Sequence, residues 1–210
     1  MVSAAAPFAS SLEASRSGCT VFQQCSDIGA LIFVVPTVDT VQQAQEAAKW
    51  VRYPPVARRS TGGGQHGRVW GNDYANTYND NCILICMVET AVGIANAHDI
   101  ARVPGVDVVI TGNCKRNAFS IRRAIRLANR KSTAIADDLQ RFTGLQAGDP
   151  LYDKMLQDAC DGVKRAGKIF GTTMPTQAEG ETFSADAQFF YTGPSNDGWS
   201  REDMKSAYGS

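Results

Sequence analysis

The stretch from Ala30 to Pro55 constrains the fold more than any other part of this 210-residue chain. It begins with an apolar run, Leu31 to Val35, that is rich in β-branched residues and is typical of a strand buried on both faces of a parallel sheet. A polar loop follows, Thr40 is a suitable N-cap, and small apolar residues recur at helical spacing as far as Val51. Pro54-Pro55 then stops the helix. The stretch predicts one β/α unit with chemistry at the C-terminal end of its strand.

The rest of the chain repeats this alternation of strand and helix. Four further apolar runs predict strands, at residues 82–88, 106–111, 168–172 and 187–192. Helical patterns lie at residues 20–28, 91–101 and 153–166. Strands separated mostly by helices predict an α/β protein with parallel strands, and both a barrel and an open sheet satisfy this order. We expect a flexible arm at residues 1–18, one domain at 19–200 and a tail at 201–210.

The composition narrows the class of protein. The 21 basic and 21 acidic residues balance, which gives the whole chain no electrostatic reason to bind a nucleic acid or a membrane. No apolar run approaches the roughly 20 residues of a spanning helix, and residues 1–10 lack the pattern of a secretion signal. The six cysteines show no C-x-x-C pair, so we expect reduced, mostly buried thiols. A cytoplasmic protein with a small-molecule substrate is the expectation.

Two segments interrupt the alternation. Residues 57–81 are rich first in glycine and then in aromatic residues, and a long loop of this kind is either functional or disordered. Residues 114–136 contain seven basic side chains and no acidic one, in a run that looks helical. Such a charge run is usually a solvated helix face, and a contact with a nucleic acid or an acidic lipid is the alternative.

Four motifs follow one another in a recognisable order. They are V-V-P-x-V-D-T at residues 34–40, R-Y-P-P at 52–55, M-V-E-T at 87–90 and V-P-G-V-D-V-V-I-x-G at 103–112. In this order they resemble the HpcH/HpaI aldolase and citrate lyase superfamily, the metal-dependent pyruvate aldolases and their relatives such as macrophomate synthase. The resemblance runs from about Asp27 to Trp199. It implies a (β/α)8 TIM barrel that is incomplete at its N-terminus in this chain.

The resemblance also implies a divalent cation held between two carboxylates, and Glu89 matches the first of them. An independent argument points to the same residue. Glu89 directly follows a run of apolar residues, at the C-terminal end of a predicted strand, where parallel α/β proteins build their sites. The structural alternative is that this carboxylate caps the helix that begins near Ala91.

The second carboxylate has two possible alignments. Directly after Gly112-Asn113 the chain offers Lys115, and a lysine cannot bind a cation. The sequence from Asp137 to Leu145, by contrast, resembles the family's D-L-S-x-x-x-G-L motif with its aspartate at Asp138. In that alignment residues 114–136 are an insertion, which is either a genuine appendage or translated non-coding sequence. Asp138 is then the second ligand.

Two carboxylates with open positions suit Mg²⁺ or Mn²⁺. The family comparison implies that a 2-oxo acid chelates this cation through its carboxylate and keto oxygens and that the cation stabilises the enolate. Backbone amides near Gly112 would hold the substrate carboxylate. Asn113 stands where the family commonly has proline.

The family's first strands carry a histidine for proton transfer and an arginine that contacts the substrate, and neither motif is visible in residues 1–29. Roughly three of the eight barrel strands are then missing. An open parallel sheet exposes its edges, so we expect a homo-oligomer, strand exchange or an incomplete gene product.

Two residues are candidates to replace the missing groups. Arg59 aligns with the last arginine of the family's R-Y-P-P-x-G-x-R-G and would bind a carboxylate bidentately. His66, in the glycine-rich segment, would transfer a proton by loop closure, since histidine titrates near neutral pH. For His98, on a helix behind the strand ends, we expect a structural or surface role.

The function implied by the resemblance is therefore a metal-dependent carbon–carbon lyase, an aldolase that acts on a 2-oxo acid. Two alternatives stay open. One is a non-catalytic or repurposed family member with a structural or regulatory role. The other is a cyclase of secondary metabolism like macrophomate synthase, because the choice of acceptor depends on the shape of the pocket.

Overall fold

A computed structural model of the protein describes residues 2–5, 16–62, 64–111, 138–145, 149–173 and 188–191. Several predictions from the sequence concern other residues. Gly112, Asn113, the basic segment 114–136 and the tail 201–210 all lie outside the described residues.

The described strands form one parallel sheet of six. They are β1 (Val2–Ala5), β2 (Ala30–Val35), β3 (Ile83–Val88), β4 (Val108–Thr111), β5 (Ile169–Thr173) and β6 (Phe189–Tyr191). Their spatial order is their order in the sequence, and each pair of neighbours is parallel. A doubly wound sheet would reverse its strand order at a switch point, whereas sequential order is the order within a β/α barrel. The predicted α/β class with parallel strands is confirmed.

The N-terminus differs from the expected arm. Residues Val2–Ala5 form β1, and helix α1 (Arg16–Asp27) begins within residues 1–18 as well. The sequence of β1 is short and its side chains are small, so it carries no apolar run that would have predicted a strand. Its backbone pairs in parallel with β2, from Val2 beside Ala30 to Ala5 beside Val34.

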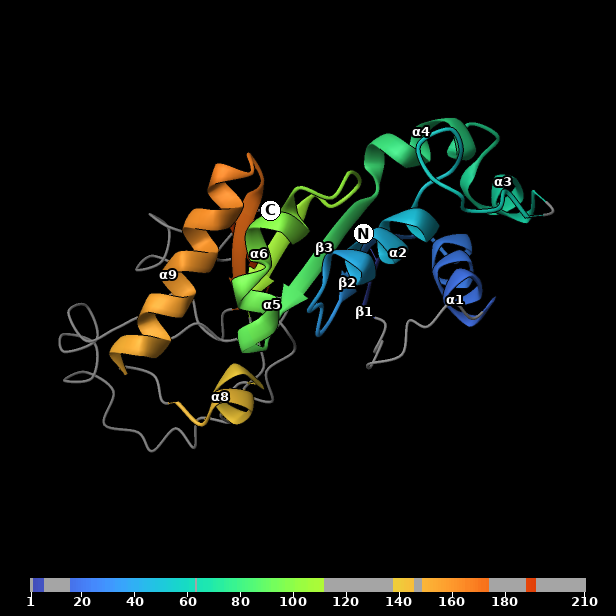
Figure 1. The fold of residues 1–210 in the computed structure, drawn as a ribbon. Coiled ribbons are helices and arrows are strands. Elements are labelled where there is room, and N and C mark those ends of the chain that lie inside the picture. Colours follow the sequence, from blue (N-terminus) through green and yellow to red (C-terminus); the bar gives the residue numbers. More distant parts are fainter. Residues whose placement is uncertain are drawn as a thin grey trace, which may run out of the picture.

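Seven further helices connect the strands of the described chain. They are α2 (Val41–Val51), α3 (Gln65–Trp70), α4 (Tyr74–Asn81), α5 (Ala91–Ala95), α6 (Ala97–Ala101), α8 (Asp138–Thr143) and α9 (Pro150–Arg165). Figure 1 shows α2, α5, α6 and α9 along one face of the sheet, with α3 and α4 beyond the N-terminal end of β3 and α8 near its other end. Residues 57–81, which interrupted the expected alternation, thus contain two short helices rather than a continuous loop.

Helix α2 begins as its sequence predicts. The Thr40 side chain accepts a hydrogen bond from the backbone N–H of Gln43 at 3.2 Å, and Gln43 Oε1 accepts one from the Thr40 N–H at 3.0 Å. This reciprocal capping box satisfies donors that the first helical turn leaves unpaired. Ala44, Ala47 and Val51 lie on the buried face of the helix.

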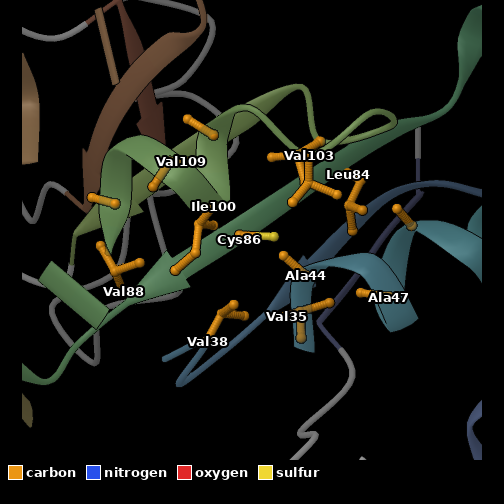
Figure 2. Packing of buried hydrophobic residues seen from close by; sticks show 14 of the residues in the cluster. Val35, Val38, Ala44, Ala47, Leu84, Cys86, Val88, Ile100, Val103 and Val109 are labelled. Atoms are coloured by element: carbon orange, nitrogen blue, oxygen red, sulfur yellow. The ribbon is translucent and has the colours of Figure 1, made fainter. Parts of the chain in front are cut away.

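The core has two layers, one on each face of the sheet. Alternate side chains of β3, namely Leu84, Cys86 and Val88, face the helices, and Figure 2 shows them packed with Ala44 and Ile100. The other alternate set forms a second buried cluster of Val34, Ile85, Val108 and Ile110. Burial on both faces explains why the strand sequences are continuous apolar runs.

Two further findings concern the cysteines and the hydrophobicity of the helices. The cysteines Cys25, Cys82, Cys86 and Cys160 carry free thiols. In the part of the chain that the structure describes, no helix has the length and hydrophobicity that crossing a membrane would require.

The two-sided core predicts a large cost for a cavity in β3. Replacing fully buried Leu84 by alanine should lower the free energy of unfolding by about 3 kcal/mol, because the lost methyl groups leave a space that the packed helices fill only in part. Leu151→Ala, the same change at a side chain that is 55% exposed, should stay within about 0.5 kcal/mol of the wild type. Urea denaturation measures both, and equal effects would contradict this description of the core.

Burial also makes stability fall at alkaline pH. Desolvation raises the pKa of the Cys86 thiol to about 12. The native thiol therefore keeps its proton at a pH where the unfolded thiol, with its ordinary pKa of about 8.5, has lost it. The contribution of Cys86 is complete below pH about 8.5 and is lost, at about 1.4 kcal/mol per pH unit, as the pH rises toward 12. Cys86→Ala should show a shallower fall than the wild type in urea denaturation at pH 8 to 10.5. Parallel profiles would contradict the prediction.

Candidate active site

The carboxylate of Glu89 lies at the C-terminal edge of the sheet, directly after β3, and is only 7% exposed. It meets the loop that follows β2. Its Oε2 accepts a hydrogen bond from the Thr37 backbone N–H at 3.0 Å and another from Thr37 Oγ1 at 3.3 Å. The parallel register of β2 and β3, with Val35 beside Cys86, brings these two strand ends to the same edge.

Further contacts join the loop after β2 to the loop after β3. The Val38 N–H donates to the Met87 carbonyl at 2.9 Å, and the Asn96 side-chain amide donates to the Asp39 carbonyl at 2.7 Å. The Thr90 hydroxyl donates to Asp39 Oδ1. We call the segments 36–40 and 87–96, tied in this way, the paired loops, although the second of them includes the short helix α5.

The cap of helix α5 belongs to Thr90. Its Oγ1 accepts a hydrogen bond from the Gly93 N–H at 3.0 Å, and its backbone has the extended conformation of an N-cap residue. Glu89 therefore does not cap this helix, which corrects the structural alternative considered for its carboxylate.

The second predicted metal ligand begins helix α8. Asp138 is the first residue of that helix, and α8 packs against α5, which starts two residues after Glu89. Figure 1 shows α8 beside α5, near the C-terminal end of β3. The structure thus packs the helix that Asp138 begins against the helix that follows Glu89, while the Asp138 side chain is outside the description.

The predicted substrate-binding residues, Gly112 and Asn113, follow the strand that neighbours β3. Strand β4, the neighbour of β3, ends at Thr111, immediately before Gly112-Asn113. Within the described ranges, no three His, Cys, Asp or Glu side chains are grouped so that they would hold a metal ion. Glu89 is a buried carboxylate at this edge, and its hydrogen bonds with Thr37 already orient it.

Arg59 lies at the opposite edge of the sheet. It is 1% exposed, and its Nε and Nη2 donate to Ser26 Oγ and Asp27 Oδ1, each at 2.7 Å. Its guanidinium stacks on Tyr53 at 4.1 Å and on Tyr78 at 4.8 Å from the ring centres. Burial raises the pKa of the Tyr78 hydroxyl, so this side of the cluster stays neutral.

His66 belongs to the same buried cluster. Its ring lies 6.1 Å from that of Tyr53 and 5.3 Å from that of Tyr74, between ring centres, and its Nδ1 is 4.0 Å from Asp27 Oδ1. Asp27 ends α1, just before β2 begins at Ala30. A strand of six residues, about 20 Å, therefore separates this cluster from Glu89.

The structure thus brings neither Arg59 nor His66 to Glu89, and the sequence-based prediction of a catalytic role for them does not match their position. The physical reason is the direction of α2. A helix that follows a strand in a β/α unit runs back toward the start of the sheet, so the residues after Pro55 emerge at the N-terminal edge.

Two of the recognised motifs also meet at that N-terminal edge. Arg52, of the R-Y-P-P motif, donates to the carbonyls of Gly105 at 2.6 Å and Cys82 at 2.9 Å and to Asp107 Oδ2 at 2.6 Å. Asp107 Oδ2 also accepts from the Leu84 N–H at 2.7 Å. Arg52 and Asp107 therefore tie the end of α2 to the beginnings of β3 and β4.

His98 has the structural role expected for it. Its Nδ1 lies 2.8 Å from the carbonyl oxygen of Gly162 in α9, across the contact between α6 and α9. Thr37, by contrast, is a residue of the site that the sequence did not single out. The motif that contains it was recognised, but nothing in a polar loop indicates which side chain will turn toward a carboxylate on another strand.

Comparisons with known proteins find a family model and several aldolases that are similar to this chain. Residues 14–114 match the model of the HpcH/HpaI aldolase/citrate lyase family, and the resemblance predicted from the motifs is confirmed. A hydroxypyruvate/pyruvate aldolase of Chromohalobacter salexigens is 30% identical over 170 residues, 78% of this chain and 58% of that protein. A 2-keto-3-deoxy-L-rhamnonate aldolase of Klebsiella pneumoniae subsp. pneumoniae is 31% identical over 176 residues, 80% of this chain and 57% of that protein.

A solved structure agrees at the level of the fold. The crystal structure of macrophomate synthase matches with a TM-score of 0.65 and 18% identity, over 90% of this chain and 60% of that one. This chain therefore spans less than two thirds of the length of the aldolases and of the solved structure that it matches.

The buried position of Arg59 predicts that this side chain stabilises the fold, whereas the exposed side chain of Arg58 does not. Arg59→Ala should lower the free energy of unfolding by about 3 kcal/mol, because it removes one partner of a buried ion pair with Asp27. Arg58→Ala, at the adjacent exposed arginine, should change it by less than about 0.5 kcal/mol. Urea denaturation compares the two, and a similarly small effect of both would contradict the structural role.

Proposed function

Since the chain belongs to the HpcH/HpaI aldolase/citrate lyase family, we propose that it is a divalent-metal-dependent aldolase, a carbon–carbon lyase acting on a 2-oxo acid. The observation that carries the proposal is the carboxylate of Glu89. It is buried at the C-terminal edge of a parallel sheet, the edge at which β/α barrels build their active sites, and two hydrogen bonds from Thr37 orient it.

The proposed fold is a (β/α)8 barrel of which this chain supplies a part. Two observations support it. The described strands follow one another in sequence order and in parallel, and both faces of the sheet are buried. The inner face of such a barrel is filled by alternate side chains, which the cluster of Val34, Ile85, Val108 and Ile110 would provide.

The proposed metal ligands are Glu89 and Asp138, with Mg²⁺ or Mn²⁺ as the ion, because hard cations prefer carboxylate oxygens. When bound, the cation would act as a Lewis acid that stabilises an enolate. The buried position of Glu89 and the packing of α8 on α5 support this pair. Backbone N–H groups near Gly112, beside Asn113, would hold the substrate carboxylate.

The remaining residues in the proposal bind and orient rather than react. The paired loops hold Glu89 in place, and its low exposure excludes bulk water from one side of the site. Arg59 and His66 stabilise the far edge of the sheet in this proposal and take no part in the chemistry.

The proposed partner is a small 2-oxo acid, and neither a nucleic acid nor a membrane is proposed as a partner. The protein itself is proposed to be a cytoplasmic homo-oligomer. Two exposed apolar side chains support a subunit contact: Ile28 lies in the turn between α1 and β2, and Trp70 donates its indole N–H to the Asp27 carbonyl beside that turn.

Metal binding tests the proposal. Glu89→Gln should weaken Mn²⁺ binding in isothermal titration by at least about tenfold, because the variant loses the charge and one oxygen of a ligand. Glu46→Gln, the same change on α2 and away from the strand ends, should bind Mn²⁺ like the wild type. Equal binding by the wild type and Glu89→Gln would overturn the metal assignment.

Turnover tests the reaction. The wild type should release pyruvate from a 4-hydroxy-2-oxo acid, detected by coupling to lactate dehydrogenase. A chelator should abolish the activity and added Mn²⁺ should restore it. Metal binding without turnover of any such acid would favour the non-catalytic alternative.

A further inference from the structure

Thr37 has an unusual backbone conformation for its residue type. Its φ is +53°, in the left-handed region, and among the described residues it is the one non-glycine residue with a positive φ. A β-branched side chain is an outlier in that region, because its branched Cβ crowds the backbone. Such conformations cost free energy and persist where the surroundings enforce them, frequently at functional sites.

The conformation places two donors of one residue on one oxygen. Both the N–H and the Oγ1 of Thr37 donate to Glu89 Oε2, at 3.0 and 3.3 Å. Two donors from one fixed residue restrict the rotation of the carboxylate more than one donor would. The strained backbone and the orientation of the carboxylate are thus parts of one arrangement.

The neighbouring residues prevent the loop from relaxing. The Val38 N–H is bonded to the Met87 carbonyl, and Asp39 is held by Thr90 and Asn96. Helix α5 also approaches closely, since a Cβ added to Gly93 would lie 2.8 Å from the Val38 carbonyl oxygen. The chain on the C-terminal side of Thr37 is therefore clamped, and Pro36 on its other side has a fixed φ.

We infer that Thr37 is a positioning residue for Glu89, one that presets the carboxylate for a divalent cation. The inference rests on the proposed function, because it assigns Thr37 the task of orienting a metal ligand. Residues that orient a ligand from behind typically change metal affinity by about 10–100-fold when they are replaced. Removing only the hydroxyl leaves the N–H bond in place, so about tenfold is the expected effect.

Three variants separate orientation from stability. Thr37→Val keeps the shape and the backbone strain but loses the hydroxyl donor, Thr37→Ser keeps the donor, and Thr37→Gly loses the donor and relieves the strain. Thr77→Val is the matched control, because it removes a hydroxyl from an exposed threonine on α4 at the far edge of the sheet. Isothermal titration with Mn²⁺ gives the affinity and thermal denaturation gives the stability of each protein.

We expect the affinity for Mn²⁺ and the thermal stability to respond differently to the substitutions. Thr37→Val should bind Mn²⁺ about tenfold more weakly, Thr37→Ser should bind within about threefold of the wild type, and Thr77→Val should be unchanged. Thr37→Gly should be at least as stable as the wild type and still bind more weakly, which a merely structural role would not produce. If Thr37→Val fails to fold, the Mn²⁺ affinity of Thr37→Gly still tests the inference.

Two outcomes would overturn the inference, and they are distinguishable. If Glu89→Gln weakens Mn²⁺ binding but Thr37→Val and Thr37→Gly bind like the wild type, Thr37 does not position Glu89 and the proposed function stands. If the wild type binds no Mn²⁺, or Glu89→Gln binds equally well, the proposed function fails and the role of Thr37 fails with it.

Discussion

Strands β2, β3 and β4 are buried on both faces, so polar side chains in this part of the protein lie at the strand ends. Each end has its own set of interactions. At the C-terminal edge Glu89 accepts two hydrogen bonds from Thr37, and at the N-terminal edge Arg52 and Asp107 join α2 to the neighbouring strands. The apolar sheet keeps these sets apart by the length of a strand. It therefore separates groups that orient a carboxylate from groups that hold the sheet together.

The separation of the two sheet edges shows which family motifs contribute to the candidate site and which stabilise the sheet. The four motifs that indicate the family divide evenly between the two edges. V-V-P-x-V-D-T and M-V-E-T supply Thr37 and Glu89 at one edge, whereas R-Y-P-P and the aspartate of V-P-G-V-D bond to each other at the other. In this chain two of the four motifs thus serve hydrogen bonding within the sheet, and their place relative to the strand direction distinguishes them from the two that meet at Glu89.

The parts that sequence predicted well are those in which a local pattern dictates the structure. The apolar run of β2, the capping residue Thr40 and the acidic residue after β3 each have a local physical cause, and the structure contains all three elements where expected. Strand β1 escaped prediction because its sequence contains no apolar run, and a pairing with β2 along the backbone leaves no local pattern in the sequence. The buried position of Arg59 and the turned backbone of Thr37 depend on contacts with residues 32 and 52 positions away, which no local pattern encodes.

The Gln43 side chain has a consequence for how the loop before α2 can change in evolution. Its Oε1 accepts from the N–H groups of both Asp39 and Thr40, so the start of the helix and the end of the loop share one acceptor. An added or deleted residue between Pro36 and Thr40 would break that shared bond and the contacts to β3 at once. The hydrogen bonds of this chain therefore constrain the length of the loop more than the identity of the side chains that point away from it.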